Sequence, residues 1–387
     1  FKQKTAYEIG VRLVGSEMCI RDRSPGLRRW EIPMRDTSAM KFLFIGAGAI
    51  GTYVGGSLAD AGHDVSFVEQ PAAAEIIRAE GLTIVRHLAK GDDRPERTHV
   101  QDVTLFTSPS DALAAGPYDV AVCALKSFDT GSAIEAMIAT GHEVPPVLSL
   151  QNGVDNEPLI GSLLGSGNVI AGTVTTAVGK PGIGQVIEEK RRGLGVSLEH
   201  HLGADLVGAL SSAGLNARGY AHAGPMKWSK LLTNLQGNAT SAILDLTVRE
   251  VFADKRTFAL EIAALRECLE VMKALGFSAV DLPGTPVKAL AFGVRRVPTP
   301  LLQPILVKML GEGRGDKMPS FHIDLHSGRG QTEVQFLNGA VVRHGADVGV
   351  PTPVNTLLTD TLQALTSGTE SKETFRKNPE ALLARLP

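Results

Sequence analysis

The stretch that most constrains this chain is residues 41–51, which read Lys-Phe-Leu-Phe-Ile-Gly-Ala-Gly-Ala-Ile-Gly. A short apolar run, typical of a buried strand, meets Gly46, Gly48 and Gly51 in the spacing G-x-G-x-x-G, and an apolar helical pattern follows. A second strand-like run then ends at Glu69. The order strand, glycine turn, helix, strand and acid is the arrangement that holds a dinucleotide.

Each part of this segment has a physical role in that interpretation. Gly46 permits a tight turn, Gly48 lets the backbone approach a pyrophosphate, and Gly51 lets the helix pack closely on the strand. The first N–H groups of the helix then face the phosphates. The alternative is an ordinary glycine-rich turn between a strand and a helix. The predicted cofactor contacts here are Gly46, Ala47, Gly48, Ala49, Ile50, Gly51 and Glu69.

Composition limits the classes of function. The chain has 387 residues, of which 43% are hydrophobic, and a formal net charge of -2. These values suit a globular protein and predict no nucleic-acid or membrane-surface partner. The three cysteines include no close pair, which argues against a disulfide framework and a zinc site and favours a cytoplasmic location. Because no run of about 18 uncharged apolar residues occurs, we expect no membrane span.

The first 39 residues do not share the pattern that follows. They are rich in arginine and show no sustained period, and residues 5–23 resemble a translated sequencing-adaptor string. We therefore interpret residues 1–39 as a non-native or disordered leader, with natural translation starting near Met40 or Met34. An arginine-rich organelle-targeting peptide is the alternative, but such peptides are poor in acids and this segment contains Glu8, Glu17, Asp22 and Glu31, among others.

The rest of the chain divides by the periodicity of its apolar residues. Residues 40–223 alternate strand-like and helix-like runs, which predicts a Rossmann-type doubly wound sheet. Strand-like runs at residues 168–222 are expected to extend or edge the same domain. Residues 224–387 show long helical patterns, interrupted by a proline-rich break at residues 297–304. The predicted fold class is an α/β N-terminal domain that binds a dinucleotide, followed by a mostly α-helical substrate and catalytic domain.

A helical pattern from Pro225 to about residue 244 carries an unusual polar stripe. Lys230, Asn234 and Asn238 are spaced i, i+4 and i+8, which places them on one face of a continuous helix. Asn is a weak helix former, so a stripe of one Lys and two Asn favours the lining of a polar cleft. An ordinary solvated face is the alternative.

Several separated motifs resemble those of the 2-dehydropantoate 2-reductase (ketopantoate reductase) family. Besides the glycine loop they are Ala-Leu-Lys at 124–126, Gln-Asn-Gly at 151–153 and Trp-Ser-Lys-Leu…Asn…Asn at 228–238. Further motifs are Pro-Ser-Phe-His-Ile-Asp at 319–324, Gly-Arg-Gly-Gln-Thr-Glu at 328–333 and Leu-Asn-Gly at 337–339. Together they span residues 41 to about 340 in the family's order.

The resemblance implies NAD(P)H-dependent reduction of a 2-oxo acid, with ketopantoate to pantoate, a step of pantothenate and coenzyme A biosynthesis, as the leading case. It implies that Lys230 is the general acid, and that Glu333 holds a substrate hydroxyl close to that lysine. Hydride transfer to a ketone leaves negative charge on oxygen, which a cation stabilises and can protonate. The remaining implied contacts are Asn234, Asn238 and Ser320 with the substrate, and Lys126 and Asn152 with the cofactor near its nicotinamide end.

The chain also departs from the family. Many members place an Arg near Gln70 to pair with the 2′-phosphate of NADPH, whereas Glu69 here would hydrogen-bond a ribose diol and repel that phosphate. We therefore expect a preference for NADH, although Arg78 or Arg86 could still reach the phosphate. Lys317 and the stretch 247–250 differ too, which leaves the substrate open.

Two other functions remain open from the sequence. One is a relative of the same architecture that acts on another 2-oxo acid or forms an opine-type product. The other is a non-catalytic NAD-binding sensor, in which the helix that carries Lys230 would be buried at an interface. No metal is expected, because His322 and His326 have no third ligand beside them. The sequence also leaves a homodimer open.

Overall fold

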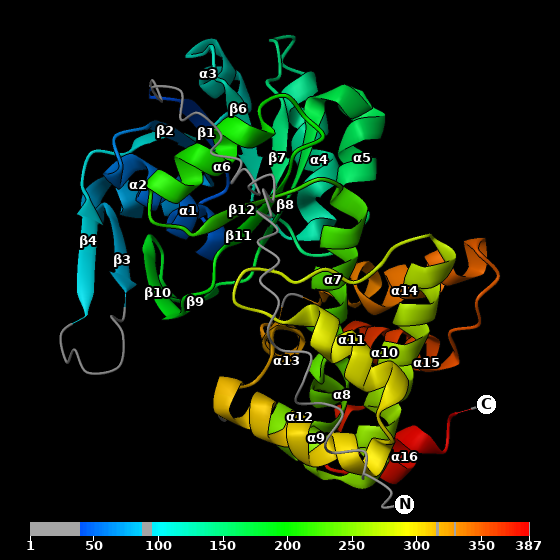
Figure 1. Ribbon diagram of the computed structural model, residues 1–387. Coiled ribbons are helices and arrows are strands. Elements are labelled where there is room, and N and C mark those ends of the chain that lie inside the picture. The colour runs from blue at the N-terminus through cyan, green and yellow to red at the C-terminus, as the bar shows by residue number, and fades with distance from the viewer. Residues whose placement is uncertain (1–38, 87–94, 315–316, 329, 387) are drawn as a thin grey trace, which may run out of the picture. The chain divides into compact units, whose positions relative to one another are not determined.

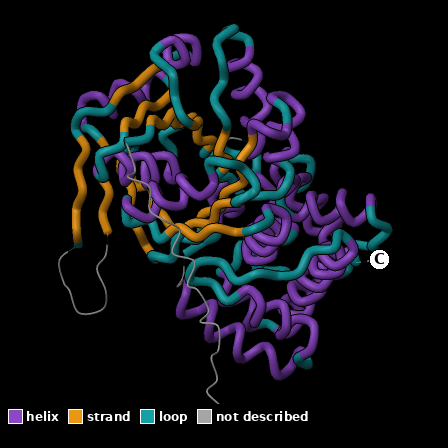
Figure 2. The backbone as a smooth tube through the Cα atoms, turned by 45° about the horizontal axis from the view of Figure 1, so that its top comes forward, coloured by secondary structure: helices purple, strands orange, loops and turns teal. Residues whose placement is uncertain are grey.

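The computed structural model describes residues 39–86, 95–314, 317–328 and 330–386. The expected leader at residues 1–39 therefore lies outside the described residues, apart from Ala39. Thr37–Pro387 form one compact unit. Within it, the strands lie in residues 40–222, called the sheet lobe here, and residues 223–386 form a helical lobe (Figures 1 and 2). The proposed domain boundary at 223/224 stays a prediction, and helix α7 begins at Ala223.

An eight-stranded sheet organises the sheet lobe, with the strand order β12-β11-β8-β7-β6-β1-β2-β5. Neighbouring strands are parallel except for β8 and β11, which are antiparallel. The strands are β1 (Lys41–Ile45), β2 (Asp64–Val68), β5 (Thr104–Phe106), β6 (Val120–Cys123), β7 (Val147–Ser149), β8 (Val169–Val174), β11 (Leu194–Ser197) and β12 (Ala217–Tyr220).

Both faces of this sheet are covered, which explains the uninterrupted apolar runs of its strands. Phe42 and Phe44 of β1 pack into a core with helices on one face, while Leu43 and Ile45 pack into a core on the other. Helices α1 (Ala49–Asp60), α2 (Pro71–Glu80) and α6 (Gly203–Ser212) contribute to the first core, and α3 (Pro109–Ala114), α4 (Thr130–Ile138) and α5 (Asn156–Leu164) contribute to the second.

A second, four-stranded sheet was not predicted. Its order is β4-β3-β10-β9, with β3 (Leu82–Arg86), β4 (Glu96–Val100), β9 (Ala177–Gly182) and β10 (Gln185–Lys190). Only β8, β11 and β12 of the runs in residues 168–222 extend the main sheet. This small sheet packs on α1 through a buried polar group, in which Arg86 donates to Ser57 (2.8 Å) and Tyr53 donates to Glu188 (2.5 Å).

The helical lobe has its own apolar core, to which nearly one whole side of the long helix α10 contributes. The structure thus confirms the predicted fold class, an α/β sheet part followed by a mostly helical part. Its helices are α7 (Ala223–Leu235), α8 (Asn238–Leu244), α9 (Val248–Ala253), α10 (Lys255–Ala274), α11 (Val287–Arg296), α12 (Thr299–Arg314), α13 (Ser320–His326), α14 (Asn338–Asp347), α15 (Pro353–Ser367) and α16 (Pro379–Leu383).

Two expectations about these helices need correction. The proline-rich break expected at 297–304 is shorter: α11 ends at Arg296 and α12 begins at Thr299, so only residues 297–298 separate the helices. Pro304 lies within α12, where the missing N–H removes a single helical hydrogen bond. The helix expected over residues 225–244 is divided into α7 and α8 at Gly237, whose φ is +66°. Asn238 therefore begins a new helix instead of continuing the face of Lys230 and Asn234.

The division between α7 and α8 is stabilised by a buried carboxylate. Glu261 of α10 is 1% exposed and accepts hydrogen bonds from the Gly237 N–H (2.7 Å) and from the Thr240 hydroxyl (2.5 Å). The left-handed conformation at Gly237 frees its N–H from the helical pattern, and Glu261 satisfies it.

Among the described residues, no helix combines the length and apolar character needed to cross a bilayer.

Replacing Glu261 with Met should lower the free energy of unfolding by about 2 kcal/mol, because the Gly237 N–H and the Thr240 hydroxyl lose their acceptor while buried. Urea denaturation followed by circular dichroism measures this. Glu270→Met on the exposed side of the same helix is the matched control and should change stability by less than about 0.5 kcal/mol. Equal effects of the two substitutions would contradict the role assigned to Glu261.

Candidate active site

The glycine loop has the close contacts that its sequence predicts. Gly46 has a φ of +92°, and a Cβ on Gly51 would lie 2.1 Å from the Gly46 carbonyl oxygen. Helix α1 starts directly after Gly48, and no side chain in the described part of the chain caps its N-terminus. The first N–H groups of α1 are thus left for a ligand, as a bound pyrophosphate requires. The residues present therefore fit a dinucleotide.

Glu69 lies beside this loop, as predicted. Its carboxylate accepts a hydrogen bond from the Ala47 N–H (2.6 Å) with one oxygen and from the Gln70 N–H (2.8 Å) with the other. The acid at the end of β2 is therefore fixed against the turn after β1. The two arginines considered for the 2′-phosphate of NADPH have other partners in this structure. Arg86 is buried against Ser57 of α1, and Arg78 donates to the Leu105 carbonyl (3.1 Å).

The topology of the sheet places further predicted residues at the same edge. β1 lies between β2 and β6, so the chain leaves β1 to one side and returns on the other, which is where doubly wound sheets bind ligands. Lys126 follows β6, and Asn152 follows β7. The loop after β6 also touches the glycine loop, since a Cβ on Gly46 would lie 2.7 Å from Leu125 Cδ2.

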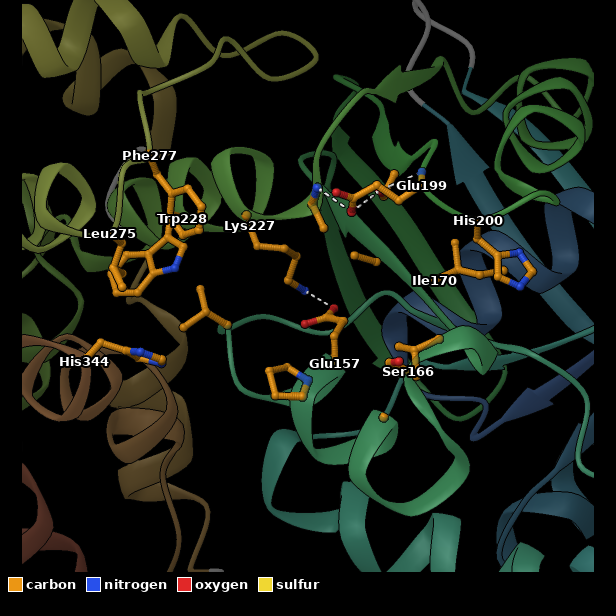
Figure 3. Close-up of a pocket in the computed structure, with 18 residues that line it drawn as sticks. Glu157, Ser166, Ile170, Glu199, His200, Lys227, Trp228, Leu275, Phe277 and His344 are labelled. Atoms are coloured by element: carbon orange, nitrogen blue, oxygen red, sulfur yellow. Dashed lines mark hydrogen bonds and ion pairs between the residues drawn. The ribbon is translucent and has the colours of Figure 1, made fainter. Parts of the chain in front are cut away.

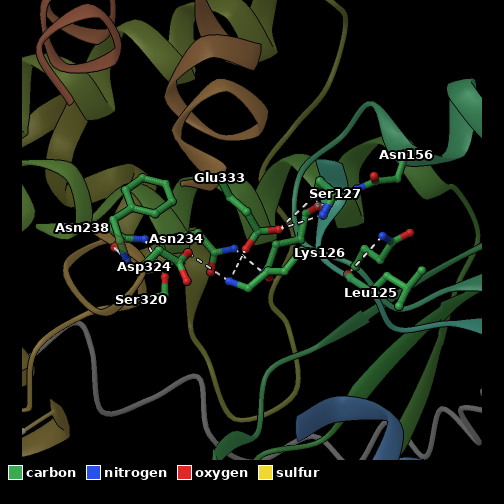
Figure 4. Close-up of polar contacts among 12 residues, drawn as sticks. Leu125, Lys126, Ser127, Asn156, Asn234, Asn238, Ser320, Asp324 and Glu333 are labelled. Atoms are coloured by element: carbon green, nitrogen blue, oxygen red, sulfur yellow. Dashed lines mark hydrogen bonds and ion pairs between the residues drawn. The ribbon is translucent and has the colours of Figure 1, made fainter. Parts of the chain in front are cut away.

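A cluster of charges joins the two lobes at this edge (Figure 4). The Lys126 ammonium lies 2.7 Å from Glu333 Oε2 and 3.0 Å from Asp324 Oδ2, both from the helical lobe. Burial by itself lowers the pKa of Lys126, but the two carboxylates outweigh burial and raise the pKa above its ordinary value. Lys126 is therefore a stable cation at neutral pH, and Asp324 is a partner that the sequence did not single out for a role.

Ser127 and Asn156 are two more residues that sequence reasoning missed. Ser127 donates both its N–H and its hydroxyl to Glu333 Oε1, each at 3.1 Å. Asn156 in turn donates to the Ser127 hydroxyl (3.2 Å) and to the Asn152 carbonyl (2.7 Å). These contacts fix the Glu333 carboxylate against the sheet lobe. The only sign of these two residues in the sequence was that they lie close to the Ala-Leu-Lys and Gln-Asn-Gly motifs.

The amides of the predicted site also bridge the lobes. Asn234 donates to Asn152 Oδ1 (2.8 Å), which brings the half-buried polar face of α7 against the turn after β7. Asn238 donates to Ser320 Oγ (3.3 Å) and accepts from the Phe321 N–H (3.1 Å), so it fixes the start of α13. Lys230 is half-buried and lies one turn before Asn234 on α7.

Gln-Asn-Gly is more than a simple turn. Gly153 has a φ of +89°, and a Cβ there would lie 2.8 Å from the Phe336 carbonyl oxygen. Phe336 ends the 3₁₀ turn η3 (Glu333–Phe336), which also carries Glu333. The glycine therefore allows the helical lobe to approach close enough for Glu333 to reach Ser127.

A second lysine of α7, Lys227, was also missed. Its ammonium is buried and contacts three oxygens: the carbonyls of Gln151 (2.7 Å) and Gly172 (3.1 Å) and Glu157 Oε1 (2.7 Å). All three of its N–H donors thus have an acceptor nearby. Lys227 thus fixes the backbone of the Gln-Asn-Gly turn at its first residue. The sequence drew attention only to Lys230.

Two residues that depart from the family pattern have structural partners. Lys317 pairs with Glu189 of β10 (2.5 Å), and Thr247 begins α9 with a capping box in which Glu250 bonds back to the Thr247 N–H (2.7 Å). His322, considered above as a metal ligand, instead contacts Asp245 (2.8 Å). Among the described residues no group of three or more potential ligands is arranged to hold a metal ion.

Fold and site together define a two-lobed oxidoreductase whose Rossmann-type lobe is built for a nicotinamide dinucleotide, NAD(P)H. The chain belongs to the ketopantoate reductase PanE/ApbA family, which confirms the resemblance. The N-terminal part of that family matches residues 42–196, and its C-terminal part matches residues 224–366.

Relatives and solved structures agree with this membership. A 2-dehydropantoate 2-reductase of Pyrococcus horikoshii is 25% identical over 326 residues, covering 82% of this chain and 95% of the relative. One of Mesorhizobium japonicum is 29% identical over 340 residues, covering 81% and 94%. The crystal structure of a PanE/ApbA family ketopantoate reductase from Ralstonia eutropha JMP134 has a TM-score of 0.70 at 29% identity, covering 85% and 99%. D-Mandelate dehydrogenase with NADH and anilino(oxo)acetate shares the fold, with a TM-score of 0.67 at 21% identity and coverage of 85% and 99%.

Gly51→Ala should weaken NADH and NADPH binding by at least about tenfold, because the new Cβ would displace the Gly46 carbonyl and with it the glycine loop. Fluorescence titration of the reduced cofactor measures the dissociation constant. Gly131→Ala is the control, since its Cβ would have only one ordinary contact, 3.7 Å from Leu159 Cδ2. Unchanged affinity in Gly51→Ala would mean that this loop does not hold the cofactor.

Proposed function

We propose that the protein uses NAD(P)H to reduce a 2-oxo acid to a 2-hydroxy acid, with 2-dehydropantoate as the leading substrate. The observation that carries this proposal is the meeting of the two lobes at the switch point of the sheet. There the Lys126–Glu333 pair and the Asn152–Asn234 bond lie at the edge that carries the glycine loop. The curated relatives named 2-dehydropantoate 2-reductase support the choice of substrate.

The cofactor would be held by residues that the structure brings to one edge. The N-terminus of α1 and the turn at Gly46 would take the pyrophosphate, and Glu69 would take a ribose hydroxyl. Lys126 and Asn152 would face the nicotinamide end. The bound cofactor supplies the hydride, and the protein orients it and provides the surrounding charge.

Lys230 is proposed as the general acid. It lies on the turn of α7 before Asn234, and Asn234 contacts the sheet lobe directly, so this face of the helix lines the junction of the lobes. A lysine there would stabilise the developing alkoxide and protonate it. Asn238 and Ser320, hydrogen-bonded to each other, would present an amide and a hydroxyl to the substrate carboxylate. Glu333 would accept from a substrate hydroxyl.

A non-catalytic sensor is supported less well. That alternative expects the polar face of α7 to be buried at an interface, but Lys230 and Asn234 keep part of their surface exposed and Asn152 is exposed. An enzyme that reduces a different 2-oxo acid would use the same architecture and the same general acid. The substrate panel must therefore include 2-oxo acids with aromatic and with small aliphatic side chains, besides 2-dehydropantoate.

Oxidation of NADH and of NADPH, followed by absorbance with this panel, tests the reaction. We expect turnover with 2-dehydropantoate above that with the other 2-oxo acids. Lys230→Ala should lower kcat about 10²–10⁴-fold, the usual contribution of a positioned general acid, while the cofactor dissociation constant stays the same. Lys273→Ala, at an exposed position of α10, is the control and should keep full activity.

Three outcomes would each reject a part of this proposal. Cofactor binding without turnover on any 2-oxo acid would favour the sensor. Turnover highest with another 2-oxo acid would reject 2-dehydropantoate as the substrate. Full turnover of Lys230→Ala would reject the role of Lys230.

The wild-type protein is expected to prefer NADH, because the Glu69 carboxylate would lie where NADPH carries its 2′-phosphate. Glu69→Gln keeps an oxygen acceptor for the Ala47 N–H but removes the charge. The ratio of kcat/KM for NADPH to that for NADH should therefore rise about tenfold, whereas Glu75→Gln on the exposed side of α2 should leave it unchanged. A ratio that does not move would show that Glu69 does not face the ribose.

The homodimer and the cytoplasmic location stay predictions.

A further inference from the structure

A cavity lies beside α7, and residues of both lobes line it (Figure 3). Its volume is about 510 Å³, within the range of small-molecule sites. Lys227 and Trp228 of α7 line it, and no residue of the proposed catalytic, substrate or cofactor site does so in the described part of the chain. The cavity is thus separate from the proposed active site.

The walls of the cavity are mostly apolar and come from both lobes. Val154, Pro158 and Ile170 contribute from the sheet lobe. On the opposite side, Trp228 and Phe277 both contribute aromatic rings to the wall, as Figure 3 shows. Such a surface favours an apolar ring as the body of a ligand.

The charges around the cavity are unequal. Lys227 is the one lysine of the lining, and its ammonium is already engaged by Glu157 (2.7 Å) and two backbone carbonyls. Its charge is therefore already paired within the protein. Glu157 keeps 13% of its side-chain surface exposed in the cavity wall.

Among the other groups at the cavity wall, Glu199 adds a negative charge and His200 adds no charge. Burial raises the pKa of Glu199, but hydrogen bonds from the Ala223 N–H and from two side chains outweigh burial and lower it, so Glu199 is ionised at neutral pH. Burial lowers the pKa of His200, which keeps its imidazole neutral at pH 7. His344 is already paired with Asp155 (2.8 Å).

We propose that this cavity binds a small organic amine that carries one apolar ring. The ring would pack on Trp228 and Phe277, and the ammonium would face the carboxylates of Glu157 and Glu199. A cation near aromatic faces gains a further attraction from the ring electrons. A carboxylate ligand would meet the ionised Glu199 and a Lys227 ammonium already paired with Glu157, so the cavity selects against anions. This inference does not depend on the reaction proposed above.

Isothermal titration calorimetry with 2-phenylethylamine, 2-phenylethanol and 3-phenylpropanoate as probes tests the charge selection. The three probes share a ring and differ in the terminal group. We expect the amine to bind one site per chain at least about tenfold more tightly than the alcohol, and the carboxylate more weakly than the alcohol. No amine binding, or equal binding of amine and alcohol, overturns the proposal.

Gly161 of α5 provides matched variants that locate the site. A Cβ at Gly161 would make only ordinary contacts, 3.5 Å from Ser166 Cα and 3.8 Å from Val169 Cγ2. Gly161→Ala should therefore fold and still bind the amine, whereas the longer side chain in Gly161→Leu would occupy the cavity and weaken amine binding at least about tenfold. Both substitutions replace a helical glycine with a better helix former, which favours folding.

Two further measurements distinguish amine binding in this cavity from binding in the proposed active site. Amine affinity should be the same with and without saturating NADH, and the same in Lys230→Ala. Competition by NADH, or equal amine binding in Gly161→Leu and Gly161→Ala, would place the amine elsewhere and overturn the proposal. Because the readout is binding, failure of the proposed reaction would leave this test unaffected.

Discussion

The junction of the two lobes depends on how one buried carboxylate is neutralised. The side chain of Glu333 is 6% exposed, and its partners are the ammonium of Lys126 and the N–H and hydroxyl of Ser127. A buried carboxylate without such partners would cost several kcal/mol. The helical lobe can therefore bury Glu333 only where it meets the loop after β6, and the polar residues near Glu333 in the fold are fixed together with it.

The position of β6 in the sheet places this contact beside the glycine loop. β6 pairs with β1 in parallel, so the loops that follow the two strands leave the sheet at the same edge. One loop carries the glycines, and the other carries Lys126 and Ser127. Leu125 touches Gly46, which links the two loops physically. A strand order with β6 elsewhere would separate the cluster around Glu333 from the turn that fits a dinucleotide.

The parts of this fold that could be predicted are those with local causes. The turn at Gly46 and the tight approach at Gly51 depend on neighbours in the sequence, and apolar runs with the period of a helix or strand identify the elements between them. The small second sheet depends on pairing β3 with β10, about a hundred residues later in the chain. The division of α7 and α8 depends on Glu261, which lies 24 residues after Gly237. Neither partner can be recognised from its own surroundings.

The candidate site divides in the same way. The stripe of Lys230 and Asn234 could be recognised from helical spacing alone, and family motifs indicated Lys126, Asn152, Ser320 and Glu333. Ser127 and Asp324 were missed because each acquires a role from a partner about 200 residues away, Glu333 for the former and Lys126 for the latter. A serine after a strand and an aspartate in a short helix are ordinary until the fold brings these partners together.

Lys227 and Lys230 show why residue type and spacing alone cannot assign chemistry. They are three positions apart on α7, so they lie about one turn apart on the same side of one helix. Lys227 points to the Gln151 carbonyl and Glu157, where three oxygens contact its ammonium. Lys230 lies about one turn further along α7, four positions before Asn234, which meets the turn after β7. One helix therefore carries a buried structural lysine and, about one turn further along, the half-buried lysine proposed as the general acid, and residue type and spacing alone do not tell the two apart.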